Sequence, residues 1–492
     1  MTHPRIMLAA PKSGSGKTLL TCSLLRALSM RGKRVQAFKC GPDYIDPMFH
    51  KKVLGISSRN LDLFFTGEEE TKALFLEDND AEISVIEGVM GLYDGLAGTM
   101  EEASSYHLAR TLQTPILLVI NARGMGRSVL AEIAGFLSMD REHLIQGVIL
   151  NQVSASFFQS IAELIEEECH IPVFGYYPIR KDMEWQSRYL GLKLPEEIRE
   201  LQAKVTEAAE AFEKTISVDA IISMAMQFAM EHPLSCERPF WLNAPKMPQK
   251  VRIGVAFDEA FCFYYEDNFR LLEKAGAELC FFSPLHDSAL PEEIQGLLLG
   301  GGYPELVAEQ LSGQEGLRRE IKERLRQGMP SLAECGGFMY LHEEIVTPDG
   351  RNHPMVGVIS GKCFDTGKLV RFGYASFLFP RQFQRQFPRL FSGECPRGFL
   401  REDAGRFASE LIGAPGEKSG DAATEEIRGH EFHYYDSDAC GTDCKAVKPV
   451  TGRSWLCGYL GENHYWSYGH LYYPSNPAFA FWFVEQCRRW RK

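Results

Sequence analysis

Segment 9–18, Ala-Ala-Pro-Lys-Ser-Gly-Ser-Gly-Lys-Thr, has the residue types and spacing that bind nucleotide phosphates. Small residues in such a turn let backbone N–H groups converge on phosphate oxygens, and a helix that begins there adds a favourable dipole. The lysine can reach the β- and γ-phosphates, and the threonine after it can hold Mg²⁺. The segment therefore predicts an ATP site that comprises Lys12, Gly14, Ser15, Gly16, Lys17 and Thr18.

One position departs from the standard pattern G-x-x-x-x-G-K-[ST], because Pro11 stands where the first glycine is expected. With Lys12 five residues before Lys17, the loop resembles those of the dethiobiotin synthetase and septum-site ATPase group. The alternative is a glycine-serine turn before a surface helix. The order of apolar strand, loop, Gly-Lys-Thr and helix favours the nucleotide site.

Three acidic residues follow predicted strands in the same half of the chain. Asp43 and Asp46 come after the apolar run 35–38, and Glu87 directly follows the run 83–86. Ligands bind outside the carboxyl ends of parallel strands, where carboxylates can hold Mg²⁺ or face a phosphorylated intermediate. We expect Glu87 to anchor Mg²⁺, with Asp43 as a further ligand. Turn formation beside proline remains the alternative for Asp43 and Asp46.

A second set of residues predicts cysteine chemistry. Cys335 lies in segment 330–339, Pro-Ser-Leu-Ala-Glu-Cys-Gly-Gly-Phe-Met, at a predicted strand-to-helix junction. A tight elbow followed by two glycines exposes the side chain, and a helix N-terminus lowers the pKa of a thiol toward the reactive thiolate. These features predict a nucleophile for acyl transfer, and the alternative is a buried structural thiol.

Acyl transfer by a cysteine also needs an oxyanion hole and a base. The glycine turn 300–302 follows an apolar strand, so backbone amides near Gly301, Gly302 and Gly336 can form the oxyanion hole. The candidate bases lie far along the chain: His430, His433 and His470. Residue types and spacing do not choose among them.

The elements that must position these residues alternate between strand and helix patterns, which predicts an α/β fold of two doubly wound, mainly parallel sheets. Strands are expected at 6–10, 35–38, 83–86, 115–120, 147–151, 251–256, 279–282 and 296–299, and helices at 19–30, 129–137 and 265–275. Clustered prolines mark 238–250 as a linker between domains 1–237 and 251–492. Segment 413–426 is small and polar, which is typical of an insertion.

The composition of the 492-residue chain, 45% hydrophobic and 24% charged, is that of a globular protein. A net charge of -12 disfavours nucleic acid or an anionic membrane as a partner. Without a recognisable signal peptide or membrane span, the expected location is the cytoplasm. The 13 cysteines are interpreted as reduced thiols, and Cys440 and Cys444 as part of a loop rather than a zinc site.

The two sets of residues together resemble the cobyrinate a,c-diamide synthase family of corrinoid biosynthesis over nearly the whole chain. Six segments carry the resemblance in the family's order: Gly-Pro-Asp-Tyr-Ile-Asp-Pro (41–47), Glu-Gly-Val-Met-Gly-Leu-Tyr-Asp-Gly (87–95), Ala-Phe-Cys-Phe-Tyr-Tyr (260–265), Gly-Gly-Gly-Tyr-Pro-Glu-Leu (300–306), Ala-Glu-Cys-Gly-Gly-Phe (333–338) and Gly-His-Glu-Phe-His (429–433). The resemblance implies a P-loop NTPase-like domain of the dethiobiotin synthetase type joined to a class I glutamine amidotransferase domain.

The resemblance also implies the reaction. Cys335 releases ammonia from glutamine, and Mg-ATP converts the a and c acetate carboxylates of cobyrinate into acyl phosphates, from which ammonia displaces phosphate. Two rounds consume two ATP and two glutamines. The implied participants are cobyrinate, glutamine, ATP and Mg²⁺, without nucleic acid or membrane, and the expected assembly is a monomer or a homodimer.

Individual roles follow from the same resemblance. The family's Ser-Tyr-x-His-x-His-Phe segment aligns with 467–473 and implies His470 as the base, although Tyr472 and Tyr473 replace its last two residues. Asn151 resembles an adenine-reading position. Further candidates for contact with substrate or intermediate are Asp46, Asp94 and His430, and Lys39 and Arg188 are either ligands of substrate carboxylates or surface charges.

Three alternatives stay open at this stage. Another tetrapyrrole, such as nickel-sirohydrochlorin or hydrogenobyrinate, can be the substrate, because the shared motifs do not name the metal in the ring. A nucleotide-switched binding protein has a similar phosphate loop but has no need of Cys335. The second domain can also be an inactive scaffold, with free ammonia as the nitrogen donor.

Overall fold

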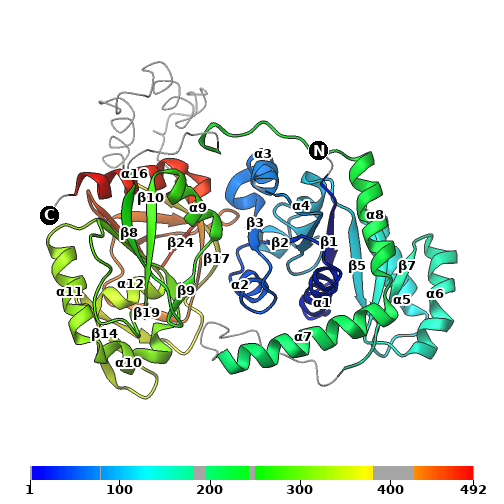
Figure 1. Cartoon of the computed structure of the whole chain (residues 1–492), viewed down its shortest axis with the longest axis horizontal. Coiled ribbons are helices and arrows are strands. Elements are labelled where there is room, and N and C mark those ends of the chain that lie inside the picture. Colours follow the sequence, from blue (N-terminus) through cyan, green and yellow to red (C-terminus); the bar gives the residue numbers. More distant parts are fainter. Residues whose placement is uncertain (1–2, 78, 181–194, 243–249, 381–425, 491–492) are drawn as a thin grey trace. The chain divides into compact units, whose positions relative to one another are not determined.

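A computed structural model of the protein describes residues 3–77, 79–180, 195–242, 250–380 and 426–490. The chain forms two compact units, residues 1–238 and 239–492, and each is described by itself (Figure 1). Arg188 and residues 413–425 lie outside the described part. None of the described helices is both long enough and apolar enough to cross a bilayer.

The first unit is built on a seven-stranded sheet with the order β3-β2-β4-β1-β5-β6-β7, and every strand pair in it is parallel. Its strands are β1 (Arg5–Ala9), β2 (Val35–Cys40), β3 (Ser58–Leu61), β4 (Ile83–Glu87), β5 (Ile116–Asn121), β6 (Ile145–Asn151) and β7 (Val173–Tyr177). The predicted parallel α/β fold is confirmed. Because the strands run the same way, the ends of β2, β4 and β6 and the loop after β1 share one edge of the sheet.

Helices connect these strands: α1 (Lys17–Met30), α2 (Ile45–Lys52), α3 (Leu63–Leu76), the short η1 (Leu96–Gly98), α4 (Ser105–Thr111), α5 (Ser128–Met139) and α6 (Ala155–Cys169). Two more helices, α7 (Pro195–Thr215) and α8 (Val218–Glu231), follow the last strand. Buried apolar residues of α1, β1, α7 and α8 form one core cluster. Side chains satisfy backbone amides at several helix starts, as where Asp62 accepts hydrogen bonds from Phe64 and Phe65 at α3. Helix α1, which begins at the end of the phosphate loop, packs into this core cluster.

Strand β3 was not predicted, because its sequence, Ser-Arg-Asn-Leu, lacks an apolar pattern. Its three polar side chains, of Ser58, Arg59 and Asn60, are buried but hydrogen-bonded. Arg59 donates to the carbonyls of Leu74 and Glu77, and Asn60 Nδ2 donates to the Gly41 and Asp43 carbonyls at 2.8 Å each. Asn60 therefore fixes the acidic loop that follows β2.

The second unit contains a six-stranded sheet with the order β10-β8-β11-β13-β23-β22, parallel except for the β22 edge. These strands are β8 (Val251–Ala256), β10 (Ala277–Phe282), β11 (Gly296–Leu299), β13 (Ser331–Glu334), β22 (Tyr459–Leu460) and β23 (His464–Ser467). The described part of this unit has the helices η4 (Phe240–Leu242), α9 (Glu266–Lys274), η5 (Pro304–Val307), α10 (Ala308–Gly313), α11 (Glu315–Arg326), α12 (Gly336–Leu341), η6 (Tyr473–Ser475) and α16 (Pro477–Arg489).

Smaller sheets complete this unit. An antiparallel sheet has the order β21-β20-β17-β18-β24, a second sheet has the order β15-β14-β16-β19, and β9 pairs with β12. Their bounds are β9 (Phe261–Phe263), β12 (Gly301–Gly302), β14 (His342–Val346), β15 (Asn352–Pro354), β16 (Ile359–Asp365), β17 (Arg371–Leu378), β18 (Glu426–His433), β19 (Tyr435–Ser437), β20 (Cys444–Val447), β21 (Ser454–Cys457) and β24 (His470–Leu471). The β18–β24 pair places His430 opposite His470.

Candidate active sites

The phosphate loop of the first unit is shaped by glycine conformation and by β6. Gly16 has a φ of +96° at the start of α1, in the region that favours glycine. A Cβ added to it would lie 2.2 Å from Nδ2 of Asn151, which donates a hydrogen bond to the Ser15 carbonyl at 2.8 Å. Oδ1 of Asn151 is buried without a hydrogen-bond partner in the described part of the chain. Asn151 thus anchors the loop through its amide N–H.

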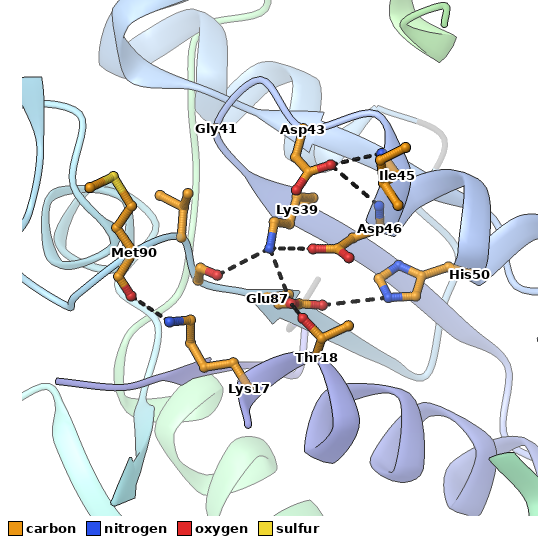
Figure 2. Close-up of polar contacts among 12 residues, drawn as sticks. Lys17, Thr18, Lys39, Gly41, Asp43, Ile45, Asp46, His50, Glu87 and Met90 are labelled. Carbon is orange, nitrogen blue, oxygen red and sulfur yellow. Dashed lines mark hydrogen bonds and ion pairs between the residues drawn. The ribbon is translucent and has the colours of Figure 1, made fainter. Parts of the chain in front are cut away.

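The two lysines of the loop differ in environment. Lys17 is 8% exposed, and its Nζ donates to the Met90 carbonyl (Figure 2). It also donates to the Lys12 carbonyl at 3.4 Å. Burial, with help from the nearby Lys39 charge, lowers the pKa of Lys17 to about 8. The Lys12 side chain is exposed. Of these two lysines, Lys17 is therefore the one whose ammonium group is buried against the loop.

A buried cluster of charged groups lies beside the loop. Thr18 Oγ1 donates a hydrogen bond to Oε1 of Glu87 at 2.6 Å, and Nζ of Lys39 lies 3.1 Å from the same oxygen. Nζ of Lys39 also lies 2.6 Å from Oδ2 of Asp46 (Figure 2). Lys39 is only 4% exposed, so it is not a solvated surface charge.

The cluster shifts the pKa values of its two carboxylic acids, Glu87 and Asp46, in opposite directions. Burial alone would raise the pKa of Glu87, but the Lys39 ammonium and the contacts with His50 and Thr18 hold that pKa below its ordinary value. Burial and the Glu87 charge raise the pKa of Asp46. The pKa of Lys39 is raised because the carboxylates outweigh its burial. Glu87 is the carboxylate that keeps its charge.

Two other predicted acids hold backbone turns. Oδ1 of Asp43 accepts from the backbone amides of Ile45 at 2.7 Å and Asp46 at 3.4 Å, where α2 begins. Oδ2 of Asp94 accepts from the amide of Gly91 at 2.9 Å. Within the described ranges, no three His, Cys, Asp or Glu side chains form a group that could hold a metal ion by themselves.

In the second unit, Cys335 occupies a strained elbow between β13 and α12. Its φ of +49° and ψ of -105° are unusual for a residue with a side chain, and its amide donates to the Ser467 carbonyl at 2.9 Å. The expectation of a lowered thiol pKa is not met. Burial, followed by the negative charge of Glu305, raises the pKa of Cys335 well above its ordinary value. Desolvation therefore outweighs the short helix α12, and the thiol is protonated.

The three predicted glycines meet around this elbow. A Cβ on Gly336 would lie 3.0 Å from the backbone nitrogen of Gly302, and one on Gly302 would lie 1.9 Å from the Ala260 carbonyl oxygen. A Cβ on Gly301 would lie 2.4 Å from Cε1 of His470. The two-residue strand β12 thus contacts the elbow through Gly302 and the His470 ring through Gly301.

The three histidines occupy two environments. The rings of His430 and His470 stack with centroids 4.9 Å apart, and Nδ1 of His430 lies 3.0 Å from the Tyr265 hydroxyl. Burial lowers the pKa of His430 to about 3 and that of His470 well below its ordinary value, so both rings are neutral. His433 instead stacks on Tyr468 at 4.2 Å. Of the three, His470 is the one that the structure packs against the Gly301 turn.

Two buried residues near these sites were not singled out from the sequence. Nε2 of His50 lies 3.6 Å from Oε2 of Glu87, and its position four residues after Asp46 on α2 was the available signal. Glu334, just before Cys335, accepts a hydrogen bond from the Tyr473 hydroxyl at 3.1 Å. Burial raises the pKa of Glu334 to about 8.

Comparison with known proteins relates both units to characterised families. Residues 6–190 match the CobQ/CobB/MinD/ParA nucleotide binding domain, and residues 252–471 match the CobB/CobQ-like glutamine amidotransferase domain. A cobyrinate a,c-diamide synthase from Caldanaerobacter subterraneus subsp. tengcongensis is 36% identical over 485 residues, which cover 98% of each chain. The chain belongs to the cobyrinate a,c-diamide synthase family.

Other members of the cobyrinate a,c-diamide synthase family show a similar relationship. The Priestia megaterium protein is 35% identical over 496 residues, with 100% of this chain and 99% of the relative covered. The Picrophilus torridus protein is 35% identical over 484 residues, with 98% of each covered. A solved structure of PurLQS from Thermotoga maritima has a TM-score of 0.29 and 16% identity over 48% of this chain and 99% of that one.

Membership of the cobyrinate a,c-diamide synthase family confirms the resemblance inferred from the six sequence segments. It makes the chain a ligase that forms C–N bonds with glutamine as the amide donor. The nucleotide binding match falls on the unit with the phosphate loop, and the amidotransferase match falls on the unit with Cys335.

Proposed function

We propose that this chain amidates the a and c acetate carboxylates of cobyrinate in an ATP-dependent reaction that uses glutamine. The observation that carries the proposal is the similarity, along the full length of both chains, to proteins named cobyrinate a,c-diamide synthase. Two sites of different chemistry support it, one in each compact unit. Within the proposal, residues 1–237 form the amide synthase domain and 251–492 the glutaminase domain.

The first unit binds ATP through its phosphate loop in this proposal. Backbone amides of Gly14, Ser15 and Gly16 face the phosphates, and the ammonium of Lys17 leaves its carbonyl partners for phosphate oxygens. The exposed Lys12 adds a second positive charge. The unpartnered Oδ1 of Asn151 accepts from the adenine amino group.

The residues beside the loop fit Mg²⁺, which prefers oxygen ligands and binds with one or two carboxylates plus phosphates and water. Oγ1 of Thr18 and Oε1 of Glu87 already lie 2.6 Å apart. Glu87 is fully buried and ionised. Asp43, whose Oδ1 accepts from the amides at the start of α2, is the further carboxylate proposed as a ligand. When bound, Mg²⁺ neutralises phosphate charge and orients the γ-phosphoryl group.

Phosphorylation solves a chemical problem for the substrate, because a free carboxylate is a poor acceptor for an amine. A carboxylate oxygen of cobyrinate attacks the γ-phosphorus, the bond to ADP breaks, and an acyl phosphate forms. Lys39 compensates the charge of Glu87 and contacts Asp46 beside this step. Asp46 and Asp94 are the acids proposed to contact the substrate or intermediate.

The second unit supplies ammonia in this proposal. Neutral His470 takes the proton of the Cys335 thiol as sulfur attacks the amide carbon of glutamine, and then gives a proton to the departing ammonia. Backbone amides at Gly301, Gly302 and Gly336 stabilise the oxyanion, and His430 supports the His470 ring. Water hydrolyses the thioester to glutamate. Ammonia displaces phosphate from the acyl phosphate and forms the amide.

The test follows both half-reactions at once. Purified protein is incubated with Mg-ATP, glutamine and cobyrinic acid, and product mass, phosphate and glutamate are measured. Cys335→Ala is assayed alongside with ammonium as an alternative donor. The proposal expects two amidations, two phosphates and two glutamates per substrate, with the variant active on ammonia alone.

Two outcomes would contradict parts of the proposal. Unchanged cobyrinic acid with continued glutamine hydrolysis would remove the substrate assignment and direct the search to other tetrapyrrole carboxylates. Glutamine-dependent amidation by Cys335→Ala would remove the nucleophile assignment.

A further inference from the structure

Glu87 has two carboxylate oxygens in different surroundings. Oε1 faces the phosphate loop, where it accepts a hydrogen bond from Thr18 and contacts Lys39. Oε2 points away from the loop, is buried, and has no hydrogen-bond partner in the described ranges. The group that it faces is Nε2 of His50, at 3.6 Å (Figure 2).

His50 is itself fully buried on α2 and is held from behind. Its Nδ1 lies 3.0 Å from the hydroxyl of Ser58, the first residue of β3. A carboxylate oxygen can only accept a hydrogen bond, so the ring nitrogen that faces it, Nε2, carries a proton, and Nδ1 is left to contact the Ser58 hydroxyl. A chain of polar contacts then runs from Ser58 on β3 through His50 to Glu87 at the end of β4.

We infer that His50 is a positioning residue that fixes the Glu87 carboxylate for divalent metal binding. This inference rests on the proposed role of Glu87 as an Mg²⁺ ligand. With Nε2–H directed at Oε2, Oε1 is the oxygen presented to the metal beside Thr18. Without His50, Oε2 loses this 3.6 Å polar contact, and the buried carboxylate is less firmly held in the orientation that presents Oε1 beside Thr18.

The rival explanation is that His50 only fills the core between α2 and β3. Two substitutions distinguish these explanations, because each replaces only one of the two ring nitrogens with a polar atom in a similar position. His50→Gln places an amide N–H near the position of Nε2, facing Glu87, and gives up the contact with Ser58. His50→Asn keeps a polar atom near Nδ1, facing Ser58, and leaves Oε2 of Glu87 without a donor.

The measurement is Mn²⁺ affinity, read from free Mn²⁺ by electron paramagnetic resonance, for the full chain saturated with a non-hydrolysable ATP analogue. Affinity for the analogue without metal is measured in parallel. We expect His50→Asn to weaken Mn²⁺ binding by roughly 10-fold or more and His50→Gln by only about 3-fold or less. Neither should change metal-free nucleotide affinity.

His107→Gln is a matched control, because His107 forms a histidine–glutamate contact with Glu68 elsewhere in the same unit, with 3.0 Å between Nε2 and Oε1. It should leave Mn²⁺ affinity unchanged. Equal Mn²⁺ affinities in His50→Gln and His50→Asn would overturn the positioning role, whatever their urea midpoints.

Glu87→Gln tests the role of Glu87 as a metal ligand separately from the role of His50. If Glu87→Gln weakens Mn²⁺ binding while His50→Asn does not, the metal site stands and the role of His50 is refuted. If Glu87→Gln itself binds Mn²⁺ as the wild type does, the metal assignment fails and the inference about His50 fails with it.

Discussion

The Thr18 hydroxyl donates a hydrogen bond to Oε1 of Glu87 at 2.6 Å, although the two residues are 69 positions apart in the chain. One lies at the start of α1 and the other at the end of β4. Adjacent parallel strands β1 and β4 bring these ends together, so the contact is a direct product of the sheet order. It places a hydroxyl and an ionised carboxylate where the proposed Mg²⁺ would bind.

Glu87→Gln should therefore impair ATP-dependent amidation without affecting glutamine hydrolysis. The amide is a weaker Mg²⁺ ligand and carries no charge, so we expect the Mg²⁺ concentration for half-maximal activity to rise by roughly 10- to 100-fold. Phosphate release is measured against Mg²⁺ concentration, and glutamate release serves as the internal control. An unchanged Mg²⁺ requirement would refute the role of Glu87.

Replacing Gly16 should damage the phosphate loop specifically. An alanine there is strained at a φ of +96° and its Cβ meets Asn151 Nδ2 at 2.2 Å. We expect Gly16→Ala to cost at least about 1 kcal/mol of stability and to abolish measurable ATP binding by calorimetry. Gly135→Ala on α5, where a Cβ meets nothing within 4 Å, is the matched control and should be neutral or slightly stabilising. Normal ATP binding by Gly16→Ala would contradict the loop geometry.

The choice of base in the glutaminase site can be tested with two neighbouring histidines. His470→Gln should lower the rate of glutamine hydrolysis by roughly 10²- to 10⁴-fold, because the thiol is protonated and needs a base. His430→Gln should have a smaller effect, since the His430 ring stacks on the His470 ring and its Nδ1 contacts the Tyr265 hydroxyl. Glutamate release is the readout, and ammonia-dependent amidation checks folding. A larger loss in His430→Gln would reverse the assignment.

Glu334 should make stability fall with rising pH. Burial raises its folded-state pKa from 4.5 to about 8, so between these values the folded chain retains a proton that the unfolded chain has lost. In that window the free energy of unfolding decreases by up to about 1.4 kcal/mol per pH unit. Glu334→Gln removes this term and should gain in urea midpoint relative to wild type between pH 5 and 8. Exposed Glu462→Gln is the control, and parallel pH profiles of Glu334→Gln and wild type would contradict the argument.

The sequence by itself determined the features that depend on contiguous residues. The phosphate loop, the Cys335 elbow and the apolar strands are local patterns, because turn geometry and strand burial follow from neighbouring residue types. These patterns were enough for the α/β fold and for the family. They failed at β3, where Arg59 and Asn60 are buried and no apolar period exists, since their carbonyl partners come from elsewhere in the chain.

Only the tertiary structure decided the protonation states and the contact partners of the site residues. It joined Thr18 to Glu87, buried Lys39 between two carboxylates, packed His470 against Gly301 and placed His50 behind Glu87. It also raised the pKa of Cys335, where the helix start alone predicted the reverse. The physical reason is that desolvation and pair interactions depend on which distant segments exclude water from a group, and residue spacing along the chain does not record this.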